Sequence, residues 1–150
     1  KDGWPTQNVT VSQIVVALQS AFEMLAGGRT DDYSERLEHA WYVHQVFNSN
    51  APQRLQLPPF GNYVAGVLER MLLKPETVGS DLDLIDRGAL YRAIPNDPNL
   101  EPVLAAIHDR VAPELRRMCL RKGLDFETLF PTPAGVEGKR RRPDALPLPE

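Results

Sequence analysis

Prolines and glycines divide this chain into segments whose lengths suit α-helices. The pair Gly27–Gly28 and the prolines at positions 52, 75, 95 and 131 mark the breaks, and each of these residue types tends to end a helix. Between the breaks, apolar residues recur every three or four positions, which is the spacing of one helix face. Only residues 8–16 compete as a β-strand. The sequence therefore predicts an all-α fold.

Start and stop signals give the expected helix boundaries. Thr10 followed by Gln13 is a capping box, and Asp32 followed by Glu35 repeats the signal. We expect helices over residues 10–26, 32–47, 62–75, 80–95, 100–122 and 125–130. No heptad pattern persists as a coiled coil requires. The predicted architecture is an irregular orthogonal bundle of five to six helices, followed by an extended, proline-rich C-terminal arm.

Several residues inside these segments carry more detailed expectations. Asn62 and Ser80 are expected to cap the third and fourth helices, and Gly88 to mark a close helix crossing. Pro113 should either kink the fifth helix or separate two abutting helices. The expected inward faces are Tyr33, Leu37, Ala40, Trp41, His44 and Phe47 on the second helix, and Leu82, Ile85, Ala89 and Leu90 on the fourth.

The connection between the second and third expected helices, residues 48–61, contains three prolines. Each proline disfavours helix at the residue before it, so the segment should be extended. Its apolar residues Leu55, Leu57 and Phe60 favour packing against the core. A connection of this length is also a place where functional residues concentrate.

Composition limits the class of protein. With 150 residues, 42% hydrophobic and 25% charged, the chain can fold as one domain over residues 1–130. The lone Cys119 permits no internal disulfide, which favours an intracellular or virion-interior location, most simply the cytoplasm. No apolar run reaches the ~20 residues of a membrane span, so no membrane partner is expected.

No residue pattern indicates an enzyme, a cofactor or a metal. His39 and His44 are five residues apart, so they lie about 140° apart around a helix and do not form a zinc pair. His44 is expected to be a packing residue. Cys119 lies near cations that could activate a thiol, although a packing role is the commoner one. We therefore predict no catalytic residue and no metal-binding residue.

The last twenty residues form a distinct arm. Residues 131–150 contain five of the fourteen prolines and four of the seventeen basic residues. Such a segment favours extended polyproline II geometry and has too few apolar groups to order itself. We expect a neighbouring copy to supply its contacts, with folding back onto its own domain as the alternative. The predicted partner-binding residues are Leu146, Pro147, Leu148 and Pro149.

Basic residues gather in two places on a chain whose net charge is −3. A phosphate-binding stripe is the functional interpretation, and its affinity would fall with salt. Helix-dipole stabilisation, a nuclear-localisation signal or a solvated linker are the alternatives. The candidate nucleic-acid contacts are Arg110, Arg116, Arg117, Arg121 and Lys122, together with Lys139, Arg140, Arg141 and Arg142.

These features favour a self-assembling structural protein, a coat- or nucleocapsid-like subunit. The body would pack with copies of itself as a homo-oligomer, the arm would contact neighbours, and the arginines would meet RNA. This hypothesis compares architecture and not sequence, and architecture alone does not establish function. An intracellular adaptor domain is the first alternative. A helical enzyme assembled from distant residues is the second.

Overall fold

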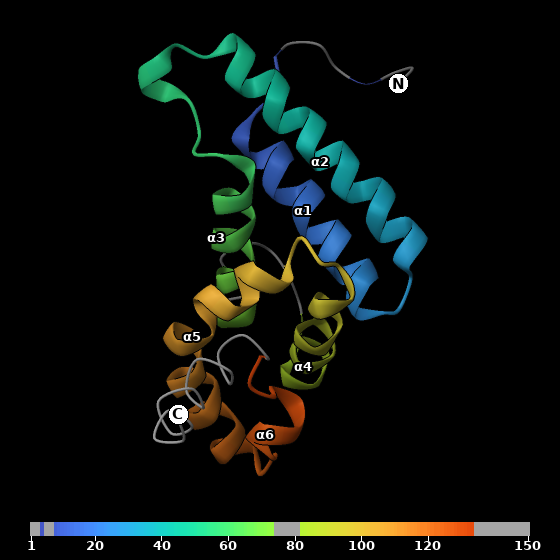
Figure 1. Ribbon diagram of the computed structural model, residues 1–150, viewed down its shortest axis with the longest axis vertical. Helices are drawn as coiled ribbons and strands as arrows, with labels where there is room; N and C mark the ends of the chain where they lie inside the picture. The colour runs from blue at the N-terminus through green and yellow to red at the C-terminus, as the bar shows by residue number, and fades with distance from the viewer. Residues whose placement is uncertain (1–3, 5–7, 74–81, 134–150) are drawn as a thin grey trace, which may run out of the picture.

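A computed structural model describes residues 4, 8–73 and 82–133, and these residues contain helices and no strand (Figure 1). The all-α prediction is confirmed. The predictions for Lys139–Arg142 and Leu146–Pro149 lie outside the described residues. The helices are α1 (Val11–Ala26), α2 (Thr30–Asn50), α3 (Phe60–Leu73), α4 (Leu84–Ala93), α5 (Glu101–Lys122) and α6 (Phe126–Leu129), with the 3-10 turns η1 (Gln53–Leu55) and η3 (Ile94–Asn96).

The predicted capping box starts α1. Gln13 N donates to Thr10 Oγ1 at 3.2 Å, and Thr10 N donates to Gln13 Oε1 at 2.6 Å. At the other end, Gly28 adopts a left-handed φ of 78°, a conformation that glycine adopts without strain. The capping box therefore excludes the strand alternative for residues 8–16.

The second helix is longer than predicted at both ends. It begins at Thr30, so Asp32 lies in its first turn and does not cap it. It continues through Asn48 to Asn50, because the amides that suggested a break make bonds compatible with helix: Asn50 Nδ2 donates to Val46 O at 2.9 Å, and Asn48 Oδ1 accepts from Leu57 N at 2.8 Å. Trp41 was predicted to face inward and is instead 49% exposed.

The third and fourth helices also differ from prediction at their starts. Helix α3 begins at Phe60, two residues before the expected cap Asn62. Helix α4 is capped by Asp83, whose Oδ1 accepts from Asp86 N at 2.8 Å; Ser80 lies outside the described residues. The prediction that Ile85 faces inward is wrong, since its side chain is 51% exposed. The buried stripe of α4 consists of Leu84, Gly88, Leu90 and Tyr91.

One uninterrupted helix, α5, contains Pro113 in its interior and Pro102 in its first turn. The alternative of two abutting helices is therefore wrong. Gly123 ends α5 with a left-handed φ of 71°, as predicted. Helix α6, which follows α5, packs so closely on α4 that a Cβ on Gly88 would lie 3.1 Å from Leu129 Cδ2, which confirms the close crossing.

Of the apolar residues in the long connection, Leu57 and Phe60 pack on the core as expected, whereas Leu55 is 56% exposed.

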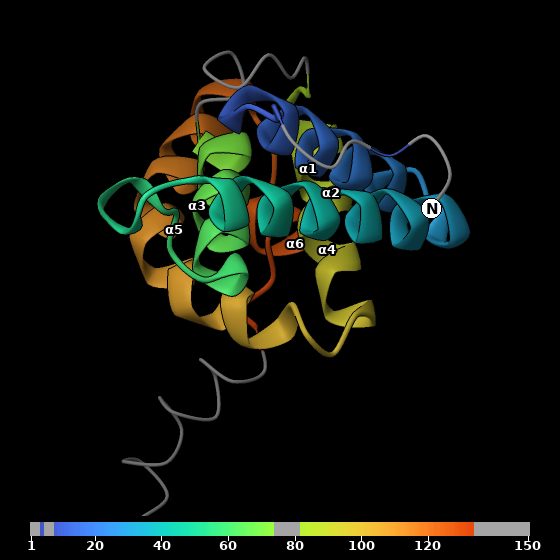
Figure 2. The ribbon, with the colours of Figure 1, turned by 90° about the horizontal axis from the view of Figure 1, so that it is seen from above.

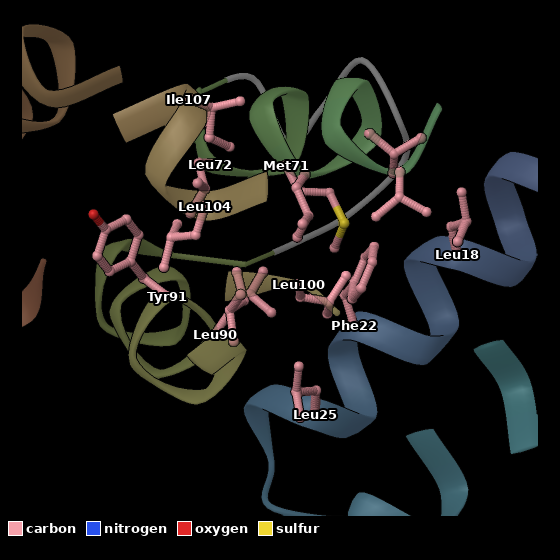
Figure 3. Packing of buried hydrophobic residues seen from close by; sticks show 14 of the residues in the cluster. Leu18, Phe22, Leu25, Met71, Leu72, Leu90, Tyr91, Leu100, Leu104 and Ile107 are labelled. Atoms are coloured by element: carbon pink, nitrogen blue, oxygen red, sulfur yellow. The ribbon is translucent and has the colours of Figure 1, made fainter. Parts of the chain in front are cut away.

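The helices form an irregular bundle. Helices α1 and α2 lie side by side as an antiparallel hairpin, and α3, α4 and α5 cross below it at steep angles (Figures 1 and 2). Their inner faces meet in one core, in which Phe22, Met71, Leu90 and Leu104 are almost completely buried (Figure 3). Within the described ranges, none of the helices combines the length and apolar character needed to cross a bilayer.

Candidate functional site

An apolar groove lies where α2 faces the start of α3 and the loop that leads into α5. Its volume is about 660 Å³, within the range of about 300–1,000 Å³ typical of ligand sites. The residues that line it come from four segments of the chain: Leu25, Thr30, Tyr33, Ser34, Leu37, Glu38, Trp41, Phe60, Gly61, Val64, Asn96, Asp97, Pro98, Asn99, Leu100 and Val103. We call this feature the Trp41 groove.

The floor of the Trp41 groove is part of the hydrophobic core, whereas its rim is open to solvent. Leu25, Val64 and Leu100 are at most 4% exposed, and Leu25 and Leu100 face the core interior in Figure 3. On the rim, the indole of Trp41 is 49% exposed. A large aromatic side chain that is half exposed beside an apolar floor offers a binding surface of the kind found at protein interfaces.

A partly buried hydrogen bond joins the two sides of the groove. Tyr33 Oη donates to Asp97 Oδ2 at 2.6 Å, and Asp97 Oδ1 accepts from Asn99 N at 3.0 Å. Both carboxylate oxygens are thus used, one to hold α2 and one to shape the loop before α5. Burial, and next the hydrogen bond and charge of Asp97, raise the pKa of Tyr33 far above its ordinary value, so the phenol stays a hydrogen-bond donor.

The Phe60 end of the groove is fixed by His44. The ring nitrogen Nε2 of His44 donates to Pro58 O at 3.0 Å, while Nδ1 accepts from Gln45 Nε2 at 3.2 Å. The ring centroid of His44 lies 5.3 Å from that of Phe60 in an edge-to-face contact. Burial lowers the pKa of His44, and the bond to Pro58 opposes this only in part. The packing role predicted for His44 is confirmed.

The charge on the groove is negative. Among the described residues that line it, Glu38 and Asp97 are the charged ones, and none is a lysine or arginine. A cationic segment would therefore meet no like charge at the rim, and electrostatic attraction would favour its approach.

The structure divides the predicted basic cluster of α5. Arg110 Nη2 lies 2.9 Å from Glu69 Oε1 on α3, and Arg117 pairs with Glu114. Arg116 points towards α6, where its guanidinium lies 4.3 Å from the centroid of the Phe126 ring and 3.4 Å from Glu127 Oε2.

Two cations remain at the end of α5. Arg121 and Lys122 are exposed in its last turn, and no carboxylate in the described part of the chain pairs with them. Three of the five arginines and lysines predicted on α5 are thus partly neutralised by the chain itself.

The groups considered for catalysis lie in the core. Cys119 is fully buried, and burial, with a smaller effect of Asp125, raises the pKa of its thiol, which disfavours the reactive thiolate. His108 is also buried and contacts the hydroxyl of Tyr91 through Nδ1. Among residues 4, 8–73 and 82–133, no group of three or more His, Cys, Asp or Glu side chains is arranged to hold a metal.

Comparison with protein-family models, with curated proteins and with solved structures finds no match to this chain. The class defined by its own geometry is an all-α domain with an apolar, acid-rimmed groove.

Sequence reasoning missed most of this groove. Tyr33 and Asp97 are 64 residues apart, and no periodicity links a helix start to a distant loop. The one usable signal was the length of the connection that ends at Phe60, which marked that region as a candidate for function.

Proposed function

We propose that this chain is a self-associating structural subunit, in which the Trp41 groove holds the Leu146–Pro149 end of another copy's arm. The observation that carries the proposal is the groove itself: an open apolar groove with three aromatic residues, Tyr33, Trp41 and Phe60, in its lining. Grooves lined by aromatic side chains are the usual receptors for proline-rich segments in polyproline II geometry.

Charge favours the same occupant. The Leu–Pro end is preceded by the run Lys139–Arg142, whereas the described lining of the groove includes Glu38 and Asp97 and no basic residue. When Leu146 and Leu148 enter the groove, the four cations come near an acidic rim. This arrangement accelerates association and selects the binding direction.

The arm is long enough to reach a neighbour. From Pro133 to Leu146 the chain spans about 40 Å in polyproline II geometry, compared with a radius of gyration of about 14 Å for a domain of this size. Exchange of such arms between copies builds an assembly without requiring a large flat interface. A coat- or nucleocapsid-like role follows from that mode of assembly.

The decisive experiment measures mass by light scattering at 10–100 µM, as a rough working range. We expect the full chain to form oligomers and a chain ending at Pro133 to be monomeric. Trp41→Ala should weaken association at least tenfold, which corresponds to ~1.4 kcal/mol. The loss of one aromatic anchor at an interface typically costs more than this. The matched control is Ile85→Ala, because Ile85 is similarly exposed at 51% but does not line the groove.

Two other outcomes would contradict self-association. In the first, the full chain stays monomeric, and Trp41→Ala makes the arm sensitive to protease. This result would mean that the arm binds the groove of its own chain. In the second, the truncated chain binds a peptide of residues 139–150 no better than a scrambled peptide. This result would mean that the groove binds a segment of another protein. That second result would favour the adaptor alternative.

Contact with nucleic acid is the second part of the proposal. Its support is local: Arg121 and Lys122 at the end of α5, and the run Lys139–Arg142. Replacing the four residues of that run by alanine should reduce the slope of log K against log salt, for single-stranded RNA, by roughly 3 if all four contact phosphates. An unchanged slope would remove RNA from the proposal and leave self-association unaffected.

A further inference from the structure

A second hollow lies on the opposite side of α2, along its seam with α1. Its volume is about 440 Å³. Helix α1 contributes five of its lining residues and α2 contributes the two basic ones, and the full set is Ser12, Gln13, Val16, Ala17, Ser20, Arg36 and His39. None of the described residues lines both this hollow and the Trp41 groove.

The guanidinium of Arg36 lies in this seam, and no carboxylate among residues 8–73 and 82–133 pairs with it. Arg36 is half-buried, and its Nη1 donates to Ser20 Oγ. None of the described residues that line the hollow is acidic. One turn earlier on α2, Asp32 is paired with Arg29 at 2.6 Å. A half-buried cation that no described carboxylate pairs with attracts an anion more strongly than a solvated one.

Other groups that can hydrogen-bond to a phosphate line the same hollow. They include the hydroxyl of Ser20 and the ring of His39. Ser12 also lines the hollow, in the first turn of α1, but eight helical residues place it about 12 Å along the axis from Ser20, too far for one phosphate to contact both. Guanidinium and hydroxyl groups are donors that proteins use to bind phosphate oxygens.

The hollow also has apolar surface for the remainder of a ligand. Val16 is 58% exposed in its wall. Trp4 contacts the lining residue His39, with ring centroids 4.8 Å apart. A phosphate group at Arg36 would leave its organic part against Val16.

We propose that the α1–α2 seam is a phosphate-binding site, with Arg36 supplying the charge, Ser20 and His39 further hydrogen bonds, and Val16 the contact for the organic part of a small phosphomonoester. This site is independent of the self-association proposed above. It gives the helical body a small-molecule ligand as well as a protein partner.

The chain provides its own reporter, because it has two tryptophans, Trp4 and Trp41. In the full chain carrying Trp41→Phe, fluorescence comes from Trp4 beside the hollow. We expect saturable changes with glycerol phosphate and with inorganic phosphate, and none with glycerol. Stronger binding of glycerol phosphate identifies an ester as the ligand, whereas equal binding identifies free phosphate.

Variants test which residues carry the binding. Arg36→Met should weaken it at least tenfold, roughly the loss expected for one charge-assisted hydrogen bond. Arg54→Met is the matched control, because Arg54 is exposed and does not line the hollow, and binding should stay within twofold. Val16→Glu places a carboxylate in the wall at an exposed position and should abolish binding without unfolding the chain. Absence of saturable binding, or full binding by both Arg36→Met and Val16→Glu, overturns the proposal.

Discussion

The hydroxyl of Tyr33 donates a 2.6 Å hydrogen bond to Asp97 and so ties the start of α2 to the loop before α5. Tyr33 is 4% exposed and Asp97 is partly buried, so removing the acceptor leaves a largely buried hydroxyl without its hydrogen-bond partner. Asp97→Ala should therefore reduce the free energy of unfolding by about 2–3 kcal/mol, and Tyr33→Phe by about 1 kcal/mol. Urea denaturation of both variants and of the double variant measures the coupling between them. If the two losses simply add, the bond makes no contribution of its own.

His44 should make the fold sensitive to acid. Burial lowers its pKa in the folded state below the ordinary value of 6.5, so the unfolded chain binds a proton more readily. The stabilisation is fully present above about pH 6.5 and is lost as the pH falls below it. Urea midpoints measured between about pH 7.5 and 5 should fall less in His44→Gln than in the parent chain, because glutamine does not titrate. Identical pH profiles would show that another group controls acid stability.

Two glycines on neighbouring helices should respond to alanine in opposite directions. A Cβ on Gly66, in the interior of α3, meets nothing within 4 Å, whereas a Cβ on Gly88 lies 3.2 Å from Leu129 Cβ. Gly66→Ala should stabilise the fold by about 0.5–1 kcal/mol through helix propensity. In Gly88→Ala the crowding of α6 should exceed that gain and give a net loss of about 1 kcal/mol. Thermal denaturation compares the two, and equal stabilisation would mean that α6 moves aside without cost.

Cys119 should be unreactive until the chain opens. Its side chain is fully buried and its pKa is raised. Modification by a thiol reagent should be roughly 100-fold slower in native buffer than in denaturant, since it requires an opening of the core. A control with Cys119→Ala establishes that no other group reacts. Rapid modification under native conditions would place the thiol at the surface.

Local signals in the sequence predicted helix ends well where one side chain determines them. Thr10 with Gln13 and Gly123 each produced the expected cap, because capping depends only on residues a few positions apart. The end of α2 was misjudged because the amides of Asn48 and Asn50, which usually favour turns, here bond to Leu57 and Val46. The hydrogen bonds that these two amides make depend on the path of the connection back towards α3, which a local pattern does not specify.

Helix faces were predicted less accurately than helix positions. Trp41 and Ile85 are apolar and lie next to buried positions, but each is turned out of the core by the register that its neighbours impose. Because Trp41 faces outward and not into the core, its side chain lies on the rim of the candidate site. The groove around it depends on how α2, α3 and the residue 96–100 loop approach one another, which no single-segment pattern contains.

The pairing of α1 with α2 has a kinetic consequence. The most extensive interhelical contact in the described part of the molecule joins two sequence neighbours separated by a short Gly-Gly turn. Closing so small a loop has a low entropic cost, so this hairpin should assemble before α3 and α5, whose mutual contact requires a much longer closure. Substitutions at Leu18 or Phe22 should then slow refolding, whereas those at Leu104 should mainly speed unfolding.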